Sequence, residues 1–250
     1  MRRLISAVAL LLAFGAAAEA AEGAKPPAQH WSFSGIFGTF DRASLQRGFQ
    51  VYKESCAACH AVNMLFYRDL KGIGYQEDDI KAIAAQAKVM DGPNDAGEMF
   101  ERAGRPSDKF VRPFANENAA RAGNNGALPV DLSMVTKARV GGPDYVYGVL
   151  TGYVQTPAGV TLMEGMNYNA YFPGHQIAMP PPLQADGVPY QDGTKATVEQ
   201  QAKDVVTFLA WASEPTLEAR KQMGIKVLLF LIVMTGILYA AKRKVWASVH

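Results

Sequence analysis

The feature that most constrains what this chain can fold into is Cys56-Ala57-Ala58-Cys59-His60, which contains its only two cysteines. The Cys-x-x-Cys-His spacing is typical of covalent attachment of a c-type haem. Residues three and four apart on a helix share a face, so Cys56 and Cys59 could each bond one porphyrin. His60 follows directly and could place its imidazole under the iron. The motif therefore predicts a fold arranged around a large planar cofactor.

Three other uses of the two thiols compete with this interpretation. A short-range disulfide is the default for a pair exported to an oxidising compartment, but thioether attachment would consume both thiols. A zinc site needs two more ligands at suitable spacing. The chain has no further cysteine, and its remaining histidines are His30, His175 and His250. A thioredoxin-like redox pair favours a strand–helix setting, whereas a helix is expected before this motif.

A six-coordinate haem iron needs a second axial ligand from a distant loop. Met64 lies only four residues after His60 and so belongs to the same side of the ring. Met179 precedes Pro180-Pro181-Pro182, and prolines restrict both their own backbone and the residue before them. Such a stiff loop could hold a thioether on the iron. His175 competes, with His/His ligation giving a lower potential than His/Met, and core packing is the usual role of a methionine, so both candidates stay open.

Arg121 is a candidate partner for the cofactor's propionates. It is a single long cation among small residues in Asn118-Ala119-Ala120-Arg121-Ala122-Gly123. Carboxylates pair well with an arginine fork. From the residues alone, an ordinary surface arginine is the simpler interpretation.

The N-terminus has the pattern of a secretory signal. Arg2 and Arg3 precede an apolar run, Leu4 to Phe14, which is too short for an ordinary spanning helix. Ala18-Glu19-Ala20 then offers a small-x-small cleavage site. The pattern predicts a signal peptide over residues 1–21, with an uncleaved anchor as the alternative.

The C-terminus predicts a membrane anchor. Residues 223–241 are apolar apart from Lys226, and they would span about 28 Å as a helix. Lys242-Arg243-Lys244 follows at once, which places the tail in the cytoplasm by the positive-inside rule. A buried core helix is the alternative, although the segment has no polar face. We expect a signal peptide at 1–21, a periplasmic haem-binding domain at 22–219, a transmembrane anchor at 220–242 and a cytoplasmic tail at 243–250.

The remaining periodicity predicts a mainly α chain. Apolar spacing indicates helices from Asp41, as N-cap, to about residue 58, and over residues 77–90, 144–154 and 197–213. Residues 91–134 and 155–194 are rich in Gly and Pro and should be loops. Long loops are uncommon in a compact domain unless something else supplies the core. The expected fold is a class I c-type cytochrome-like helical domain with long loops around one haem, plus one C-terminal transmembrane helix.

Charge divides the chain into two parts. Residues 22–219 contain 17 Lys/Arg against 22 Asp/Glu, a formal charge of −5, whereas the residues after 219 contain six basic and no acidic ones. An acidic body is a poor match for nucleic acid and a better one for a cationic protein. The densest acidic cluster, Glu77-Asp78-Asp79, is equally well explained as a solvated helix start with favourable dipole charges.

An ordered series of motifs resembles the cytochrome c1 family over roughly Trp31 to Trp246. The series comprises Arg47-Gly48-Phe49-Gln50-Val51-Tyr52-Lys53, Asp91-Gly92-Pro93-Asn94, Gly97-Glu98-Met99-Phe100, Ala119-Ala120-Arg121, Asn125-Gly126-Ala127-Leu128-Pro129, Asp144-Tyr145-Val146-Tyr147, Leu150-Thr151-Gly152-Tyr153, Asn169-Ala170-Tyr171-Phe172-Pro173-Gly174, Ile177-Ala178-Met179, Ala202-Lys203-Asp204-Val205, Trp211-Ala212-Ser213-Glu214-Pro215 and Ala241-Lys242-Arg243. A haem-attachment motif alone fits many cytochromes, and this series is much more specific.

The resemblance implies a function as well as a fold. In that family the axial methionine falls on Met179 and the propionate-binding arginine on Arg121. The family forms the haem subunit of the quinol–cytochrome c oxidoreductase (cytochrome bc1) complex, a dimer in which cytochrome b is the membrane neighbour. Its members accept one electron from the Rieske iron–sulfur protein and pass it to a soluble c-type cytochrome. The isolated chain would thus be an electron carrier and not itself an enzyme.

Two other function classes remain open from the sequence. One is a stand-alone membrane-anchored monohaem electron carrier. The other is an enzyme in which the haem binds substrate at an open coordination position, which a methionine-ligated iron should resist.

Overall fold

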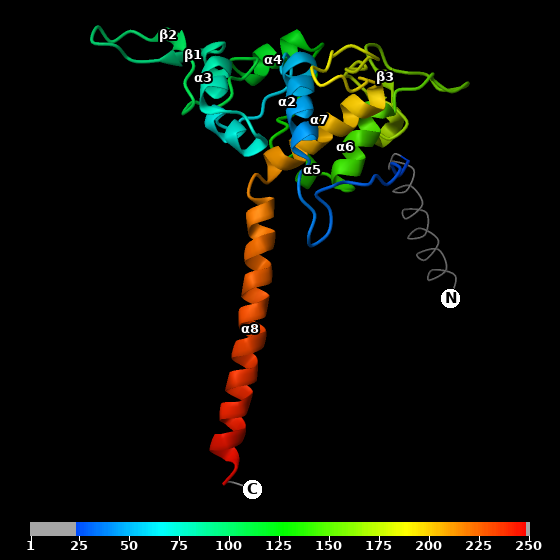
Figure 1. Ribbon diagram of the computed structural model, residues 1–250. Coiled ribbons are helices and arrows are strands. Elements are labelled where there is room, and N and C mark those ends of the chain that lie inside the picture. Colours follow the sequence, from blue (N-terminus) through cyan, green and yellow to red (C-terminus); the bar gives the residue numbers. More distant parts are fainter. Residues whose placement is uncertain (1–23, 249–250) are drawn as a thin grey trace, which may run out of the picture.

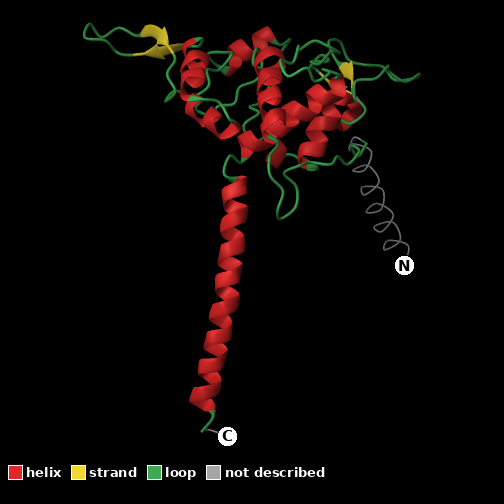
Figure 2. Cartoon of the chain, viewed as in Figure 1, coloured by secondary structure: helices red, strands yellow, loops and turns green. Residues whose placement is uncertain are grey.

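The computed structural model describes residues 24–248 and consists of a helical domain above one long helix (Figure 1). The predicted signal peptide, residues 1–21, and the last two residues of the predicted tail lie outside the described residues. Helices dominate, and strands occur only in two short pairs within the described part (Figure 2). The mainly α prediction with one C-terminal apolar helix is confirmed.

The elements are short apart from the last two helices. In chain order they are α2 (Arg42–Val51), the π-helical turn η1 (Tyr52–Cys56), the 3-10 helix η2 (Tyr67–Ile73), α3 (Glu77–Ala85), β1 (Lys88–Asp91), β2 (Phe100–Ala103), α4 (Glu117–Gly123), α5 (Val135–Ala138), α6 (Gly142–Thr151), β3 (Asn167–Tyr168), the 3-10 turn η3 (Pro173–His175), β4 (Gln176–Ile177), α7 (Val198–Ser213) and α8 (Leu217–Trp246). Both strand pairs are antiparallel, with Lys88 opposite Ala103 and Asn167 opposite Ile177.

The centre of the domain is the crossing of α2 and α7. Gly48 of α2 lies so close to α7 that a Cβ atom there would be 2.0 Å from the carbonyl oxygen of Asp204. Phe49 and Tyr52 pack their rings on Phe208, each at 5.6 Å between centroids. All these aromatic side chains are buried, so each adds about 1.5–3 kcal/mol of apolar burial. The glycine allows the backbones to approach, and the rings close the interface around it.

A buried carboxylate crosses the same interface. Asp204 is 0 % exposed and accepts hydrogen bonds from the hydroxyl of Ser44 at 2.7 Å and from Gln200 at 3.0 Å. Arg47 adds a two-pronged ion pair, with Nε at 2.8 Å and Nη2 at 3.1 Å. The hydrogen bond to Asp204 is the main cause that raises the pKa of Arg47. A buried charge with this many partners fixes the register of α2 on α7.

Three of the predicted helices differ at their ends. Asp41 is the N-cap as predicted and accepts bonds from the amides of Ala43 and Ser44. The helix does not continue regularly to residue 58, because Ala57 N–H bonds the carbonyl of Tyr52 and widens the last turn to a π-helix. The predicted helix over 77–90 ends at Ala85. The helix predicted over residues 144–154 runs from Gly142 to Thr151.

Some regular structure lies where the sequence did not predict it. The strand β1 begins at Lys88, inside the segment predicted as helix, and pairs with β2, which lies in a segment predicted as loop. The segment 91–134, predicted as irregular, also contains α4. Strand pairing and the Asn116 cap, whose side chain accepts the amide of Ala119, stabilise these short elements where propensity alone does not. The prediction for residues 197–213 is confirmed, with Thr197 as the N-cap.

The helix α8 is long and apolar enough to cross a membrane, and its apolar window is not buried against the domain. It begins before and ends after the predicted span of 220–242 and includes Lys242, Arg243 and Lys244. Glu214 connects it to the domain. This carboxylate, next to the end of α7, pairs with Lys137 of α5 and Arg220 of α8. The hydrogen bond from Arg220 is the main cause that lowers the pKa of Glu214 from 4.5 to about 2.

Gly48→Ala should destabilise the domain. Alanine would gain about 1 kcal/mol of helix propensity at an exposed position. Here the added Cβ would meet backbone atoms of α7, and such overpacking costs about 1–3 kcal/mol. We expect a net loss, seen as a melting temperature lower by several degrees in thermal unfolding. The control is Ala43→Gly, an exposed position on the same helix. A Gly48→Ala variant as stable as the parent would disprove the close contact.

The ion pairs of Glu214 with Lys137 and Arg220 should stabilise the folded protein at neutral pH and lose this effect in acid. Because the folded state lowers the pKa of this carboxyl, its contribution is complete above pH 4.5 and is lost as the pH falls towards 2. The melting temperature of the parent should therefore exceed that of Glu214→Gln at neutral pH, and the difference should shrink across that window. Glu98→Gln, in the exposed loop between β1 and β2, controls for the loss of one negative charge. A difference independent of pH would contradict the ion-pair assignment.

Candidate functional site

The Cys-x-x-Cys-His motif lies where the π-helical turn unwinds. Cys56 ends η1 and is buried, whereas Cys59 is exposed in the turn that follows. The amides of Cys59 and His60 both bond the carbonyl of Cys56, at 3.1 and 2.9 Å. The two thiols are free and therefore available for thioether bonds. Burial raises the pKa of the Cys56 thiol to about 12, so this sulfur is protonated at neutral pH before any attachment.

The Nδ1 atom of His60 forms a hydrogen bond within the protein. Its Nδ1 lies 2.7 Å from the carbonyl oxygen of Val130, which can only accept, so Nδ1 carries the hydrogen and donates. The Nε2 atom then keeps a lone pair, as a metal ligand requires. Burial is the main cause that lowers the pKa of His60, which favours the neutral ring. The hydroxyl of Tyr52 donates to the His60 carbonyl at 3.1 Å and so restrains the backbone of the same residue.

Residues 131–133 hydrogen-bond the residues that follow the cysteine motif. The amide of Leu132 bonds the carbonyl of Ala61 at 2.8 Å. The carboxylate of Asp131 accepts the amide of Asn63, and the hydroxyl of Ser133 accepts that of Met64, both at 3.1 Å. The side chain of Met64 itself is exposed. Residues 130–133 therefore orient the imidazole and fix the chain that carries it.

The segment around Met179 is held through its backbone. The hydroxyl of Tyr153 donates to the Met179 carbonyl at 3.0 Å, and Asn167 adds a weaker bond at 3.4 Å. The Met179 side chain is half-buried, and Pro180 follows it directly. These contacts restrain the residue at its carbonyl while leaving the thioether without a bonding role in the fold.

Asn169 organises the turn that precedes this segment. It is fully buried, donates to the Val149 carbonyl at 2.8 Å and accepts the amides of Tyr171 and Phe172, both at 3.1 Å. His175 closes the same turn, with its ring stacked on Tyr168 at 5.6 Å between centroids. Its Nδ1 lies 3.3 Å from the Asn169 carbonyl, so this ring is engaged in the turn.

Arg121 lies on α4 and is exposed. Its Nη1 donates to the carbonyl of Gly126 at 3.1 Å, and no carboxylate among the described residues forms an ion pair with it. The arginine therefore stabilises the start of the segment from Gly126 to Val130. The other nitrogen atoms of its guanidinium are free to bind an anion.

These segments lie on one side of the domain. The C-terminal end of α2 with its π turn, α4 and the yellow segment containing the β3–β4 pair all lie at the end of the domain farthest from α8 (Figure 1). Within residues 24–248, no group of three or more His, Cys, Asp or Glu is placed to hold a metal ion. The donors in these segments are the imidazoles of His60 and His175, two thiols and the thioether of Met179, and this set matches the ligands of a c-type haem.

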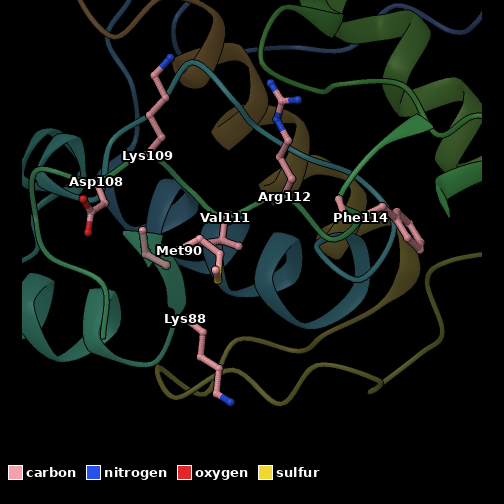
Figure 3. A pocket seen from close by; sticks show the side chains of 9 residues that line it. Lys88, Met90, Asp108, Lys109, Val111, Arg112 and Phe114 are labelled. Atoms are coloured by element: carbon pink, nitrogen blue, oxygen red, sulfur yellow. The ribbon is translucent and has the colours of Figure 1, made fainter. Parts of the chain in front are cut away.

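One cavity of the described surface lies apart from this site. A cavity of about 450 Å³ is lined by residues of β1 and of the segment before α4. In Figure 3 the side chains of Met90 and Val111 lie together at its centre, whereas Lys88, Lys109 and Arg112 extend outwards. Neither the cysteine motif nor Met179 belongs to its lining. A second cavity of about 470 Å³ adjoins the Met179 segment, with Tyr153, Asn167 and Pro181 in its wall.

The sequence interpretation missed the residues that orient the site. Val130 acts through its carbonyl, so no side-chain pattern could identify it. Tyr153 acts on the methionine segment through one hydrogen bond over a long sequence separation, and Asn169 links the turn before that segment to the distant Val149 carbonyl. The only signal for them was their place in the motifs Leu150-Thr151-Gly152-Tyr153 and Asn169-Ala170-Tyr171-Phe172, which the resemblance had already marked.

Comparison with known proteins agrees with this arrangement. The sequence model of the Cytochrome C1 family matches residues 31–249. The chain belongs to the cytochrome c1 family. Its relatives include "Cytochrome c1" of Rhodospirillum rubrum, 47% identical over all of this chain and 98% of the relative. "Cytochrome c1 1, heme protein, mitochondrial" of Arabidopsis thaliana is 51% identical over 88% of this chain and 73% of the relative.

One relative is a much longer protein. "Cytochrome b/c1" of Bradyrhizobium diazoefficiens is 50% identical over 99% of this chain, but this chain spans only 39% of it. The family match covers the described haem-motif segment, the methionine segment and α8 together. The family thus accounts for the whole arrangement of motif, loops and anchor.

Asn169→Ala should destabilise the protein. The substitution leaves two amides and one carbonyl without partners in a buried turn, and each such group costs about 1–3 kcal/mol. We expect the free energy of unfolding to fall by about 2 kcal/mol or more, as measured by urea unfolding followed by circular dichroism. Asn167→Ala, which removes only bonds of 3.4–3.5 Å, should cost less. Equal losses would show that Asn169 does not organise this turn.

Proposed function

We propose that this chain carries one covalently attached haem c and serves as the electron-transfer subunit of a quinol–cytochrome c oxidoreductase. The attachment residues are Cys56 and Cys59, and the axial ligands are His60 and Met179. The observation that carries the proposal is the geometry of His60, whose Nδ1 is bound by the Val130 carbonyl next to two free thiols. The presence of haem in a relative's name supports it.

The residues present fit such a cofactor. When bound, the haem would supply an iron that alternates between two oxidation states and carries one electron. His60 can present a neutral, oriented Nε2, because its other nitrogen is held at 2.7 Å. Tyr153 restrains Met179 at its carbonyl, so the thioether can ligate without a large loss of backbone freedom.

Met179 is the better candidate of the two ligands left open by sequence physics. The ring of His175 is stacked on Tyr168 and faces the Asn169 carbonyl, so its recruitment would dismantle the turn. Met179 needs no such change. A thioether ligand raises the potential of the haem, as suits an acceptor of electrons from an iron–sulfur protein.

Arg121 is proposed to bind a haem propionate. Its guanidinium is exposed on α4 and retains free donors beyond the bond to Gly126. An arginine fork can bind a carboxylate through two parallel hydrogen bonds.

We place the chain in a cytochrome bc1 complex with cytochrome b and a Rieske iron–sulfur protein, and we expect the complex to be dimeric. Two names support this membership. The Bradyrhizobium relative is called "Cytochrome b/c1". A Candida albicans relative, 48% identical over 92% of this chain, is called "Cytochrome b-c1 complex catalytic subunit, mitochondrial". The chain would receive one electron from the iron–sulfur protein and pass it to a soluble c-type cytochrome.

The proposed orientation places the haem domain in the periplasm and the C-terminus in the cytoplasm. The signal-like N-terminus and the basic end of α8 support the same topology. The acidic domain suits a cationic acceptor. Docking at Glu77-Asp78-Asp79 has less support, because Lys81 lies 3.3 Å from both Glu77 and Asp78, and Asp79 caps its own helix.

Purification of the full chain from its own membranes in mild detergent tests the assignment to a complex. We expect a b-type haem and an iron–sulfur protein to co-purify with it. Recovery of the chain with a single c-type haem and no partner would favour the alternative, a stand-alone membrane-anchored monohaem electron carrier.

Met179→Leu should lower the reduction potential while the haem stays attached. Leucine cannot ligate iron, so the potential should fall by a sizeable part of the roughly 0.8 V range that ligands and surroundings span. An equilibrium redox titration followed by haem absorbance measures the change. The control is Met64→Leu, whose exposed side chain should leave the potential unchanged. An unaltered potential in Met179→Leu would exclude this ligand.

A further inference from the structure

An exposed apolar loop lies just before α2. Between Trp31 and Phe40 the chain contains no charged residue. At its tip Phe37 is 82 % exposed and Ile36 is 69 % exposed. Two adjacent large apolar side chains therefore stand in the solvent without a partner among the described residues.

The loop is rigid at its base. Phe33 and Phe40 are buried on its two sides, with ring centroids 5.0 Å apart. The amide of Thr39 bonds the Ser32 carbonyl at 3.1 Å. Gly38 is required for the tight return, since a Cβ atom there would lie 1.9 Å from the Ser34 carbonyl oxygen. The fold therefore presents the two apolar tip residues in a fixed position, while the neighbouring aromatic residues face inwards.

The helix α8 holds this loop directly. Lys221 Nζ donates to the carbonyls of Phe33 and Gly38, at 2.7 and 3.0 Å. Glu218 accepts the amide of Phe40 at 2.8 Å and pairs with Arg42 at 2.6 Å. Both α8 residues precede the apolar run that begins at Met223. The base of the loop thus lies at the level where α8 enters the membrane.

The direction of the loop places its tip deeper than its base. In Figure 1 the blue segment before α2 leaves the domain on the side of α8 and extends beside the first turns of that helix. The loop tip, which extends past Lys221 along α8, therefore lies at the boundary between lipid headgroups and acyl chains. Exposed apolar side chains are stabilised at this boundary. Full burial of a phenylalanine or isoleucine is worth about 1.5–3 kcal/mol.

We propose that the loop 34–38 is a second membrane contact, which inserts Ile36 and Phe37 into the interface of the bilayer that α8 crosses. Together with the α8 helix, it would fix the tilt of the haem domain above the membrane. We assign lipid, and not a protein partner, as what the two side chains contact. The hydrogen bonds to α8 hold the loop tip at the depth of the lipid headgroups around that helix.

Photocrosslinking in native membranes tests this contact. Phe37 is replaced by benzoylphenylalanine in the full chain, and the adducts formed under illumination are identified by mass spectrometry. The same replacement at Ile36 provides a second position. The control is Phe100 in β2, which is exposed but lies away from α8 (Figure 1). Unchanged haem absorbance and melting temperature show that each variant is folded.

We expect phospholipid adducts at positions 36 and 37 and none at position 100. Adducts of positions 36 and 37 with another protein chain would overturn the proposal in favour of a subunit interface. Failure to form any lipid adduct would overturn it in favour of a water-exposed loop. Neither outcome depends on electron transfer, so the result is separable from the proposed function.

Discussion

The contact between α2 and α7 at Gly48 determines where the rest of the molecule lies. Only a glycine lets the two backbones approach this closely, and the Asp204–Arg47 pair then fixes their register. The α2 helix ends in the cysteine motif, and α7 leads directly into the membrane helix. A single interface therefore positions the cysteine motif relative to α8.

The two ends of α2 serve different purposes. At its start the chain is tied to α8 by Glu218 and Lys221, on the side of the membrane. At its other end the helix widens into a π turn and delivers His60 to the Val130 carbonyl. π-Helical turns often occur at functional sites, because the extra residue redirects side chains out of the helical repeat. Here the irregularity separates a buried Cys56 from an exposed Cys59 within three residues.

Much of the fold could be predicted from local patterns. Asp41 was recognisable as a cap, and α7 and α8 as long amphipathic or apolar runs. The ends of α2 and α3 could not be predicted in this way. A π turn depends on one hydrogen bond between Ala57 and Tyr52, and β1 forms only because a strand 12 residues later pairs with it. Helical spacing alone placed both segments in longer helices.

The sequence could propose site residues where side chains would carry the chemistry, at Cys56, Cys59 and His60 from the motif and at Met179 with the help of the resemblance. The contacts that position the candidate ligands through backbone atoms could not be predicted. These are the carbonyl of Val130, which binds His60, and the carbonyl of Met179, which binds Tyr153. Tyr153 and Asn169 fall between these cases, since their side chains act but the Met179 partner of Tyr153 and the Val149 partner of Asn169 lie far away in sequence. Long-range hydrogen bonds of this kind leave no periodic signal, and only the three-dimensional arrangement identifies them.

Covalent attachment of haem at the cysteine motif is the central claim, and mass spectrometry of the denatured, protease-digested chain tests it most directly. We expect the peptide containing Cys56 and Cys59 to carry the added mass of one haem, with both sulfurs resistant to thiol alkylation. A peptide of unmodified mass with alkylatable thiols, or one with a disulfide between the two cysteines, would contradict the account.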